Sequence, residues 1–475
     1  MKIKKNDLID LEILDLAFEG KGIAKVKTEP AGKYFTVFID GAFPGDKVTA
    51  RIIKKKSNYA EARVVEIIKP SQLRVQPSCN YFGVCGGCKQ QSLDYKSQLF
   101  YKQKQVVETI QKIGGIKDFL IEDIAGSANI YFYRNKLEFS FSDKPWLTKE
   151  ELLSDQIFTK NFALGFHIPK IYDKILDINA CWLQSELSNK ALNFTRKFFL
   201  EKNVTAYSTK THDGFLRNLV IKQSGKTKDL MVNLVTSEEN PDLLNQYSLA
   251  LRQNLPEVTT VVNNINKKLS QVAYGDYEVV YHGSGFIYDF IGEYKFRVSA
   301  NSFFQTNTVQ AENLYNCIVA FAEFKKGDIV YDLFSGAGTI SLFISKLVQS
   351  VFAFESAETS IADAKTNTDI NSVGNVLHFN SDLNKSILNF ISTKKTPKPN
   401  VIITDPPRNG MHQNTIDDIL ALLPEKIIYV SCNPATQARD IKLLCENKYD
   451  LIKIKPFDMF PHTFHIENVA LLKRK

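Results

Sequence analysis

The sequence predicts a multidomain α/β protein built from three successive parts. Short runs of alternating apolar and polar residues over 1–70 predict a small β-barrel. Alternation with one helical interval over 71–300 predicts a central α+β domain. A repeated helix–strand order over 301–475 predicts a doubly wound, Rossmann-like parallel sheet.

The N-terminal part combines five strand-like runs with a basic charge. The runs are "LIDLEILDLAF", "GKGIAKV", "YFTVFID", "KVTARII" and "EARVVEII", with glycine and proline turns between them. Residues 1–75 hold 15 Lys and Arg against 10 Asp and Glu, so they carry +5 of the net charge of +8. A basic small barrel suits an RNA or DNA partner.

Composition excludes several classes of protein. Apolar residues make up 44% and charged residues 24% of the chain, as in an ordinary soluble globular protein. No stretch approaches the roughly 20 unbroken apolar residues of a membrane helix. The start "MKIKKNDLID" lacks the apolar segment of a signal peptide. We therefore expect a cytoplasmic protein, and nothing in the sequence demands more than a monomer.

The central part begins with a cysteine cluster and a helix. The pattern is helical from Ser92 to about Ile113, where Gly114 and Gly115 end it. Residues 130–300 then alternate as in an antiparallel sheet, with a helical interval near Glu186–Glu201.

The stretch "CNYFGVCGGC" sets Cys79, Cys85 and Cys88 at C-x5-C-x2-C spacing, and Cys181 in "INACWLQ" is the candidate fourth ligand. Four thiolates suit either zinc or a [4Fe–4S] cluster. Structural zinc sites usually pair two C-x2–4-C motifs, so three clustered thiolates plus a distant one favour iron–sulfur. The remaining cysteines outside the C-terminal motifs, Cys317 and Cys445, lie in helical patterns and are expected in the core.

The C-terminal part contains a strand, a glycine turn and a helix in "DIVYDLFSGAGTISLFISK". Gly336 and Gly338 allow a ligand to approach the backbone, and the helix start offers free N–H groups. Glu355 ends the next strand, nineteen residues after Gly336, where a carboxylate can bind a ribose diol. The turn is neither the dinucleotide G-x-G-x-x-G nor a P-loop. Together these features fit S-adenosylmethionine (SAM) better than NAD.

A second motif, "TDPPRNG", places Asp405 at the end of an apolar strand on the ligand-binding edge of the sheet. A similar Asp-Pro-Pro motif marks methyl transfer to a nitrogen, but an aromatic residue then normally follows the prolines. Arg408 stands there instead, so an amino-group methyltransferase is disfavoured.

A third motif, "YVSCNPATQARD", ends the next strand in Cys432, on the same edge. Near the C-terminus "DMFPHTFHIENV" gathers His462, His465 and Glu467, which we interpret as acid–base groups facing the same cleft. A thiol nucleophile beside a carboxylate base suits methylation at C5 of uracil. Thiolate addition at C6 makes C5 nucleophilic, and a base then removes the C5 proton.

On "NSFFQTN", "DLFSGAGT", "DPPRNG", "VSCNPAT" and "DMFPHTFHIE" the chain resembles the SAM-dependent RNA uracil-C5 methyltransferases over essentially its whole length. The resemblance implies cysteine catalysis by Cys432 with Glu467 as base. It further implies a cofactor site in which Gln305 and Phe334 contact SAM, Glu355 binds its ribose and Asp382 its adenine. Asp405 would line the pocket for the cofactor and the uracil.

Within that family the chain is similar to the 23S rRNA branch, which has both an N-terminal barrel of the TRAM type and a cysteine cluster. This likeness implies a [4Fe–4S] cluster on Cys79, Cys85, Cys88 and Cys181, and a uridine of 23S rRNA as substrate. A tRNA uridine is the alternative substrate. A non-catalytic iron–sulfur RNA-binding protein is the alternative class, which the presence of both Cys432 and Glu467 argues against.

Overall fold

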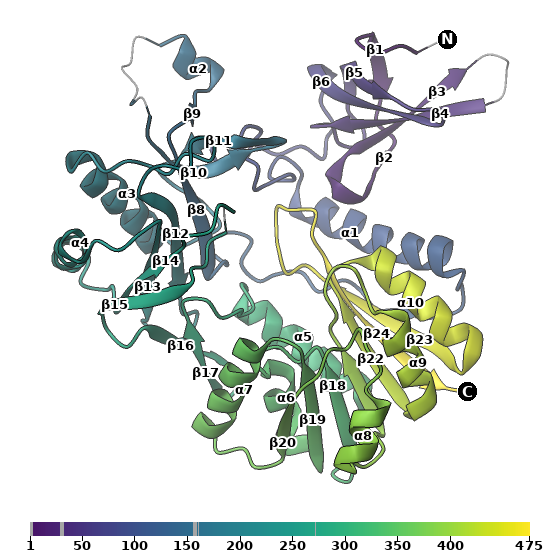
Figure 1. Cartoon of the computed structure of the whole chain (residues 1–475). Coiled ribbons are helices and arrows are strands. Elements are labelled where there is room, and N and C mark those ends of the chain that lie inside the picture. The colour runs from purple at the N-terminus through teal and green to yellow at the C-terminus, as the bar shows by residue number, and fades with distance from the viewer. Residues whose placement is uncertain (1–2, 29–32, 155–158, 160, 271) are drawn as a thin grey trace.

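A computed structural model of the chain describes residues 3–28, 33–154, 159, 161–270 and 272–475. An N-terminal sheet, a central domain and a C-terminal domain follow one another along the chain, and the C-terminal domain lies below the other two in the view of Figure 1. Among the helices of the described ranges, none has both the length and the apolar character that crossing a membrane requires.

The N-terminal part is a curved six-stranded sheet in the order β1-β5-β6-β4-β3-β2. Its strands are β1 (Leu8–Glu12), β2 (Asp15–Leu16), β3 (Gly22–Thr28), β4 (Lys33–Asp40), β5 (Lys47–Lys55) and β6 (Tyr59–Lys69). Five strands were predicted, but the first run divides. The Ile13 amide donates to the Asp46 carbonyl and the Leu14 amide to the Ile23 carbonyl, so the chain passes from one partner strand to another.

The central domain is an eight-stranded mixed sheet in the order β15-β14-β13-β12-β8-β10-β11-β9. Its strands are β8 (Lys136–Ser142), β9 (Pro145–Trp146), β10 (Ala163–Ile168), β11 (Ile171–Asp177), β12 (Leu216–Gln223), β13 (Leu230–Thr236), β14 (Thr260–Ile265) and β15 (Tyr277–His282). Its helices are α2 (Lys149–Leu152), α3 (Glu186–Glu201) and α4 (Pro241–Asn254), and α3 confirms the predicted helical interval. The hairpin of β16 (Phe286–Ile291) and β17 (Tyr294–Ser299) leads to the C-terminal domain (Figure 1).

The C-terminal domain is an α/β domain with an eight-stranded sheet in the order β20-β19-β18-β21-β22-β24-β23-β7. Its strands are β7 (Leu120–Ile121), β18 (Ile329–Leu333), β19 (Ser350–Glu355), β20 (Val376–Asn380), β21 (Val401–Thr404), β22 (Lys426–Ser431), β23 (Tyr449–Phe457) and β24 (Glu467–Arg474). Its helices are α5 (Thr308–Ala322), α6 (Thr339–Ile344), α7 (Glu358–Ile370), α8 (Leu388–Lys394), α9 (Gln413–Leu422) and α10 (Pro434–Asn447). Strands β20 and β24 were not among the predicted strands.

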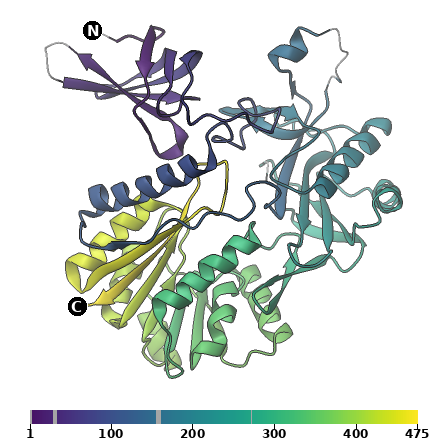
Figure 2. The same ribbon diagram turned by 180° about the vertical axis from the view of Figure 1, so that it is seen from behind.

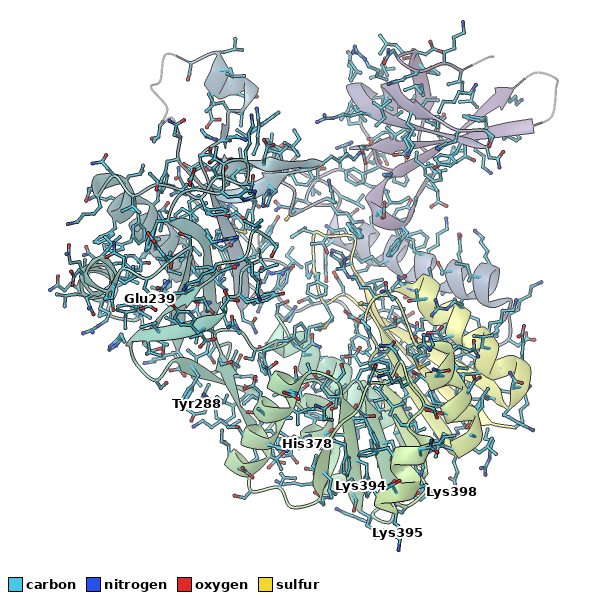
Figure 3. The ribbon with its side chains drawn as sticks, in the orientation of Figure 1. Glu239, Tyr288, His378, Lys394, Lys395 and Lys398 are labelled. Carbon is cyan, nitrogen blue, oxygen red and sulfur yellow. The ribbon has the colours of Figure 1, made fainter. Side chains whose placement is uncertain are left out.

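Apolar cores form on both faces of this sheet. One contains Val330, Ile403 and Val469 with residues of α5 and α6, and the other contains Tyr331 and Ile402 with residues of α9 and α10. The exposed residues Lys394, Lys395 and Lys398 mark the end of the domain that lies away from the other two parts (Figure 3).

The sequence analysis assigned all of 71–300 to the central domain. Two elements of this segment pack instead on the C-terminal sheet. Helix α1 (Tyr95–Thr109) buries Val106 in the core beneath α9 and α10, and Figure 2 shows it beside α10. Strand β7 pairs with β23, with Leu120 opposite Lys453. The reason is that β23 would otherwise be an open sheet edge, which α1 and β7 cover.

A buried ion pair fastens α1 to the segment between β23 and β24. The Lys102 ammonium group lies 2.7 Å from the Asp458 carboxylate, and both side chains are fully buried. Lys102 also donates to the Phe460 carbonyl at 3.3 Å, and the Phe460 amide donates to Asp458 at 3.2 Å. We call residues 458–466 the β23–β24 loop. Its start is therefore fixed by a charge on α1.

We predict that Lys102→Met lowers the free energy of unfolding by about 3–5 kcal/mol, because it leaves the Asp458 carboxylate buried without its cation. Adding Asp458→Asn should restore much of that loss. The control is Lys104→Met on the same helix, whose ammonium pairs with Asp15 at 2.5 Å but is 34% exposed. Its expected effect is below about 1 kcal/mol. Urea unfolding followed by circular dichroism measures all three, and equal effects of the two lysines would contradict the prediction.

Candidate active site

The carboxyl ends of four neighbouring strands meet at one edge of the C-terminal sheet. Parallel pairing sets Leu333 of β18 beside both Phe354 of β19 and Thr404 of β21, and Thr404 beside Tyr429 of β22. The residues that follow these pairs therefore share the edge at which α/β sheets bind ligands. They include Phe334, Glu355, Asp405 and Cys432, each of which was singled out from the sequence.

The glycine turn after β18 has a left-handed backbone. The φ angles of Phe334, Gly336 and Gly338 are 64°, 54° and 77°. A Cβ on Gly336 would meet no atom within 4 Å, so open space adjoins the turn there. A Cβ on Gly338 would lie 3.1 Å from the His378 ring, so α6 starts close to its neighbours. The turn thus presents accessible backbone beside Gly336, as a ligand cradle requires.

Glu355 lies against this turn. Its carboxylate accepts hydrogen bonds from the amides of Gly336 at 3.0 Å, Ser356 at 2.8 Å and Ala357 at 2.8 Å. The Ser356 hydroxyl donates to the same oxygen as the Ser356 and Ala357 amides, at 3.3 Å, so among the described residues Oε2 accepts from Gly336 alone. A carboxylate oxygen has about two acceptor positions, and Oε2 therefore retains capacity for a ligand hydroxyl. Asp382 lies two residues beyond β20, is exposed, and accepts from the Asn384 amide, which lowers its pKa.

Two further carboxyl groups lie behind the turn. Asp332 is fully buried in β18 and accepts from the Ser341 hydroxyl at 2.5 Å, while its other oxygen has no partner among the described residues. Burial, with a contribution from the Glu355 carboxylate, raises the Asp332 pKa to about 7. Burial and the Asp332 carboxylate likewise raise the Asp405 pKa to about 7. The sequence analysis missed Asp332, although an acid within the apolar run "DIVYDLF" was a visible signal.

Gln305 reaches the same region from the segment before α5. Its side chain is close enough to the Tyr315 hydroxyl to lower that group's pKa, and this hydroxyl lies 2.8 Å from the Thr339 hydroxyl at the start of α6. Gln305 is therefore close to the end of the glycine turn, although it precedes the C-terminal sheet in the chain.

Cys432 and Glu467 lie at facing positions of two antiparallel strands. Ser431 at the end of β22 pairs with Asn468 of β24, so one further step along each strand brings Cys432 opposite Glu467. Asparagine 433 then caps α10 by accepting from the Ala435 amide. The position of β24 between β22 and β23 is what brings the two candidate reacting groups together.

The electrostatics of the pair are dominated by burial and by like charges. Burial, then the carboxylates of Glu467 and Asp405, raise the Cys432 pKa to about 11. Burial and Asp405 raise the Glu467 pKa well above its ordinary value. The Arg408 guanidinium opposes both shifts. The sequence analysis gave Arg408 no catalytic or binding role, and the structure makes it a cation that acts on the Cys432 thiol and on the Glu467 carboxyl group.

The position of Arg408 follows from its backbone. Its carbonyl accepts from the Asn433 amide group at 3.0 Å and from the Thr436 hydroxyl at 3.2 Å, both at the start of α10. The loop after β21 is thereby tied to the strand end that carries Cys432.

The grouping of His462 with the acid–base residues was wrong. Its ring is buried, stacks on Tyr131 with centroids 4.4 Å apart, and lies 3.2 Å from the side-chain nitrogen of Gln98 on α1. Burial lowers its pKa to about 4. His462 therefore anchors the β23–β24 loop. His465 is half-buried, and burial together with Arg408 lowers its pKa to about 4.

The four clustered cysteines line one cavity of about 420 Å³, next to the β23–β24 loop: Cys79, Cys85, Cys88 and Cys181. Burial raises the pKa of Cys85 to about 11 and those of Cys88 and Cys181 to about 12. Within the described ranges, no three His, Cys, Asp or Glu residues are close enough to share a single metal ion.

The loop that carries the first three cysteines touches the β23–β24 loop directly. The amides of Lys89 and Gln90 both donate to the His462 carbonyl at 2.9 Å. The Gln91 amide group donates to the Cys88 sulfur at 3.2 Å. Cys317 is buried in α5 and Cys445 is half-buried in α10, both remote from this cavity's lining.

Comparison with known proteins identifies two regions. Residues 227–475 match the family model described as tRNA (Uracil-5-)-methyltransferase, and residues 4–65 match the TRAM domain. A Chlorobaculum tepidum protein named as an uncharacterized RNA methyltransferase is 40% identical over 477 residues, covering 100% of this chain and 98% of its own. One from Bacteroides thetaiotaomicron is 42% identical over 462 residues, covering 96% and 100%.

A solved structure is also similar over nearly the full length. The Pyrococcus abyssi tRNA (uracil-54, C5)-methyltransferase, in complex with S-adenosyl-L-homocysteine, has a TM-score of 0.74 and 28% identity, covering 98% of this chain and 100% of its own. Together with the family match over more than half of the chain, these relatives establish that this RNA methyltransferase belongs to the tRNA (uracil-5-)-methyltransferase family and begins with a TRAM domain.

Proposed function

We propose that the protein uses SAM to methylate C5 of a uridine in 23S rRNA through a covalent adduct between Cys432 and C6 of the base. The observation that carries this proposal is the facing position of Cys432 and Glu467, next to Asp405 and at the same sheet edge as the glycine turn. The family supplies the reaction class, and the site supplies a nucleophile and a base for it.

SAM fits the site beside the glycine turn. The open space at Gly336, the remaining acceptor capacity of Glu355 and the partnerless oxygen of Asp332 suit a ligand with a ribose and a positive charge. The residues that would hold it are Gln305, Phe334, Glu355, Asp382 and Asp405. When bound, SAM supplies the electrophilic methyl group. The carboxyl groups at pKa values near 7 gain stability in their charged form beside such a cation.

Cys432 makes the uracil carbon reactive. Its sulfur forms a bond to C6, and the electron pair of the C5–C6 double bond moves into the ring enolate, so C5 becomes the nucleophile. The thiol is protonated in the resting site because its pKa is about 11, so it has to lose its proton as the S–C6 bond forms. The Asp405 carboxylate, which acts on the thiol and has a pKa of about 7, takes that proton and returns it when the sulfur leaves C6. Arg408 is the neighbouring group that favours the thiolate.

Glu467 completes the reaction. After C5 has gained its methyl group it still carries a proton. A Glu467 carboxylate with a raised pKa is a stronger proton acceptor than an ordinary glutamate. Removal of that proton restores the double bond and expels the Cys432 sulfur from C6. The proton remains on Glu467 until solvent removes it.

RNA binding in this proposal uses the TRAM domain and the central domain. The first 75 residues carry +5 of the net charge, which suits phosphate contacts. The target base has to leave its stack to reach Cys432, which costs a few kcal/mol and least in a loop or bulge.

Two features favour 23S rRNA, namely the N-terminal barrel and the cysteine cluster that the chain shares with that branch of the family. One observation favours tRNA as the second candidate substrate. The tRNA (uracil-54, C5)-methyltransferase of Pyrococcus abyssi aligns over its full length with this chain, barrel region included. The barrel therefore does not by itself exclude a tRNA substrate.

A [4Fe–4S] cluster on Cys79, Cys85, Cys88 and Cys181 is part of the proposal. The four thiols line one cavity. Because their pKa values are raised, a bound metal centre is what would keep them in the thiolate form. In such a cluster each thiolate binds a different iron, so the sulfurs stand further apart than the ligands of one zinc ion. Among the described residues no three His, Cys, Asp or Glu side chains are placed to hold one metal ion, so this part of the proposal rests on the shared cavity and on the resemblance to the 23S rRNA branch. The cluster would stiffen the cysteine loop against the His462 carbonyl.

The first prediction tests reaction and substrate together. Labelled SAM and unmodified total RNA, separated into 23S, 16S and tRNA fractions, should give 5-methyluridine in 23S rRNA. Cys432→Ala should lower turnover by a factor of about 10³ or more, since the covalent step is lost. Cys445→Ala, a thiol on the following helix, should retain full activity. Label in tRNA would establish the second candidate, and absence of label with SAM bound would support a binding protein.

The second prediction concerns the base. Glu467→Gln should still allow addition and methyl transfer, so a protein–RNA adduct that survives denaturing electrophoresis should accumulate. Glu425→Gln, an exposed glutamate just before β22, is the control and should give no adduct above wild type. If Glu467→Gln turns over normally, another group removes the C5 proton.

The third prediction concerns the cysteine cluster. Protein purified without oxygen should contain about four iron and four sulfide ions per chain, and its absorption spectrum should show a broad band in the visible range. Cys88→Ser should lose the iron and the colour, whereas Cys317→Ser should keep both. Iron-free wild-type protein that contains zinc would overturn the [4Fe–4S] assignment.

A further inference from the structure

Lys222 is a buried lysine that the proposed chemistry does not use. It lies on β12 of the central sheet and is 3% exposed. Its ammonium group donates to the Ser299 carbonyl at 2.7 Å and to the Ser302 carbonyl at 2.9 Å. A buried ammonium is unfavourable unless it is well hydrogen-bonded. A methionine would fill the same space without that penalty, so the lysine has to be explained by what it holds.

The two carbonyls belong to the segment 299–308, which connects the central domain to α5. Ser299 ends β17, and Gln305 of the cofactor site lies three residues beyond Ser302. The hairpin that delivers this segment is marked by Tyr288 in Figure 3 and lies between the central sheet and the C-terminal helices. Lys222 thus reaches from one domain to the chain that carries a cofactor residue.

Asn135 holds the other end of the same segment. Its side-chain amide donates to the Gln305 carbonyl at 2.9 Å and to the Thr308 hydroxyl at 2.8 Å, and its backbone amide donates to the Thr306 carbonyl at 2.8 Å. Between the two attachments, Phe304 is buried against Phe296 with ring centroids 5.8 Å apart. The backbone on both sides of Gln305 is therefore fastened to the central domain.

The charged groups around Lys222 come from several elements. Burial, followed by the charge of Lys136 on β8, lowers its pKa to about 7. The carboxylates of Glu278 on β15, Glu138 on β8 and Asp363 on α7 act in the opposite direction. Asp363 belongs to the helix that follows Glu355, so a charge of the C-terminal domain also acts on this lysine.

We propose that Lys222 is a positioning residue for the cofactor site: by holding the carbonyls of Ser299 and Ser302, it sets the segment in which Gln305 reaches Tyr315 beside the glycine turn. Lys222 acts through Gln305 and touches neither cofactor nor RNA. The inference rests on the proposed function, in which Gln305 contacts SAM.

The test is the affinity of the full-length, RNA-free protein for SAM, measured by isothermal titration calorimetry. Lys222→Met should raise the Kd roughly tenfold, as displacement of a binding group by a fraction of an ångström does. Gln305→Ala should raise it by at least as much. The double variant should bind no more than two- to threefold more weakly than Gln305→Ala, because the lysine works through that residue. At saturating SAM, the kcat of Lys222→Met should stay near that of wild type.

The matched control is Lys226→Met. Lys226 lies in the turn after β12 and pairs with Glu312 at 3.5 Å with 42% of its side chain exposed, so SAM affinity should be unchanged. Asn135→Ala provides a second variant that tests the same segment from its other end and should also weaken SAM binding. Thermal unfolding establishes that each variant is folded.

Three results would overturn the inference. If Lys222→Met binds SAM with wild-type affinity while Gln305→Ala binds it more weakly, Lys222 has no positioning role, and the proposed function is unaffected. Additive losses in the double variant would mean that Lys222 acts by another route. Wild-type affinity in Gln305→Ala would remove the role of Gln305 and the inference with it. Transfer of label to RNA by the wild-type protein tests the proposed function separately from all three.

Discussion

The buried ion pair between Lys102 and Asp458 sets the geometry on which the candidate site depends. Lys102 is carried by α1, a helix from the linker region, and Asp458 directly follows β23. From Asp458 the chain crosses the β23–β24 loop and enters β24 at Glu467. Two opposite charges that are buried away from water stay in contact, because separating them would leave each one unpaired. The ion pair therefore fixes where the loop begins, and the pairing of β24 with β22 sets Glu467 opposite Cys432.

The same loop gathers contacts from the rest of the chain. The cysteine loop reaches it through the His462 carbonyl, and the segment before α5 reaches it through Asn307, whose side-chain amide donates to the Met459 carbonyl at 3.1 Å. The TRAM domain reaches it through Phe18, whose ring lies 5.9 Å from that of Phe464. The candidate site is thus framed by all three parts of the chain, although its candidate reacting groups come from one sheet.

The site concentrates acidic groups that cannot all be charged at once. Asp332, Asp405 and Glu467 have raised pKa values because each is buried and each lies near another carboxyl group. Like charges in a site of low dielectric disfavour a second ionisation. Arg408 offsets part of this, and in the proposed function a sulfonium ligand would offset more. Each of these groups acts as a base only in its carboxylate form, and the raised pKa then makes that carboxylate a stronger proton acceptor than an ordinary one.

How much could be predicted depended on whether a feature is local or long-range. Glu355, Asp405 and Cys432 could be placed at one edge because parallel strands end together, and each follows an apolar run. The insertion of β24 between β22 and β23 could not be predicted, since strand order depends on pairing between distant segments. For the same reason His462 was misinterpreted: its partner Gln98 lies more than 300 residues earlier in the chain. Lys222 was invisible because a single lysine in an apolar strand resembles an exposed edge residue until the segment that covers it is known.

The docking of the TRAM domain bears on how an RNA substrate would be selected. The barrel is held on α1 by the Gln105 side chain, which donates to the carbonyls of Leu16 and Ala17 at 3.0 and 3.1 Å, and by the pair of Lys104 with Asp15. Because α1 also carries Lys102, one rigid helix connects the barrel to the loop before Glu467. An RNA bound to the barrel would therefore meet the active site at a set distance and not at the end of a flexible tether. Under the proposed function, selection between a 23S rRNA and a tRNA uridine then depends on which RNA fold spans that fixed distance with an unstacked uridine at Cys432.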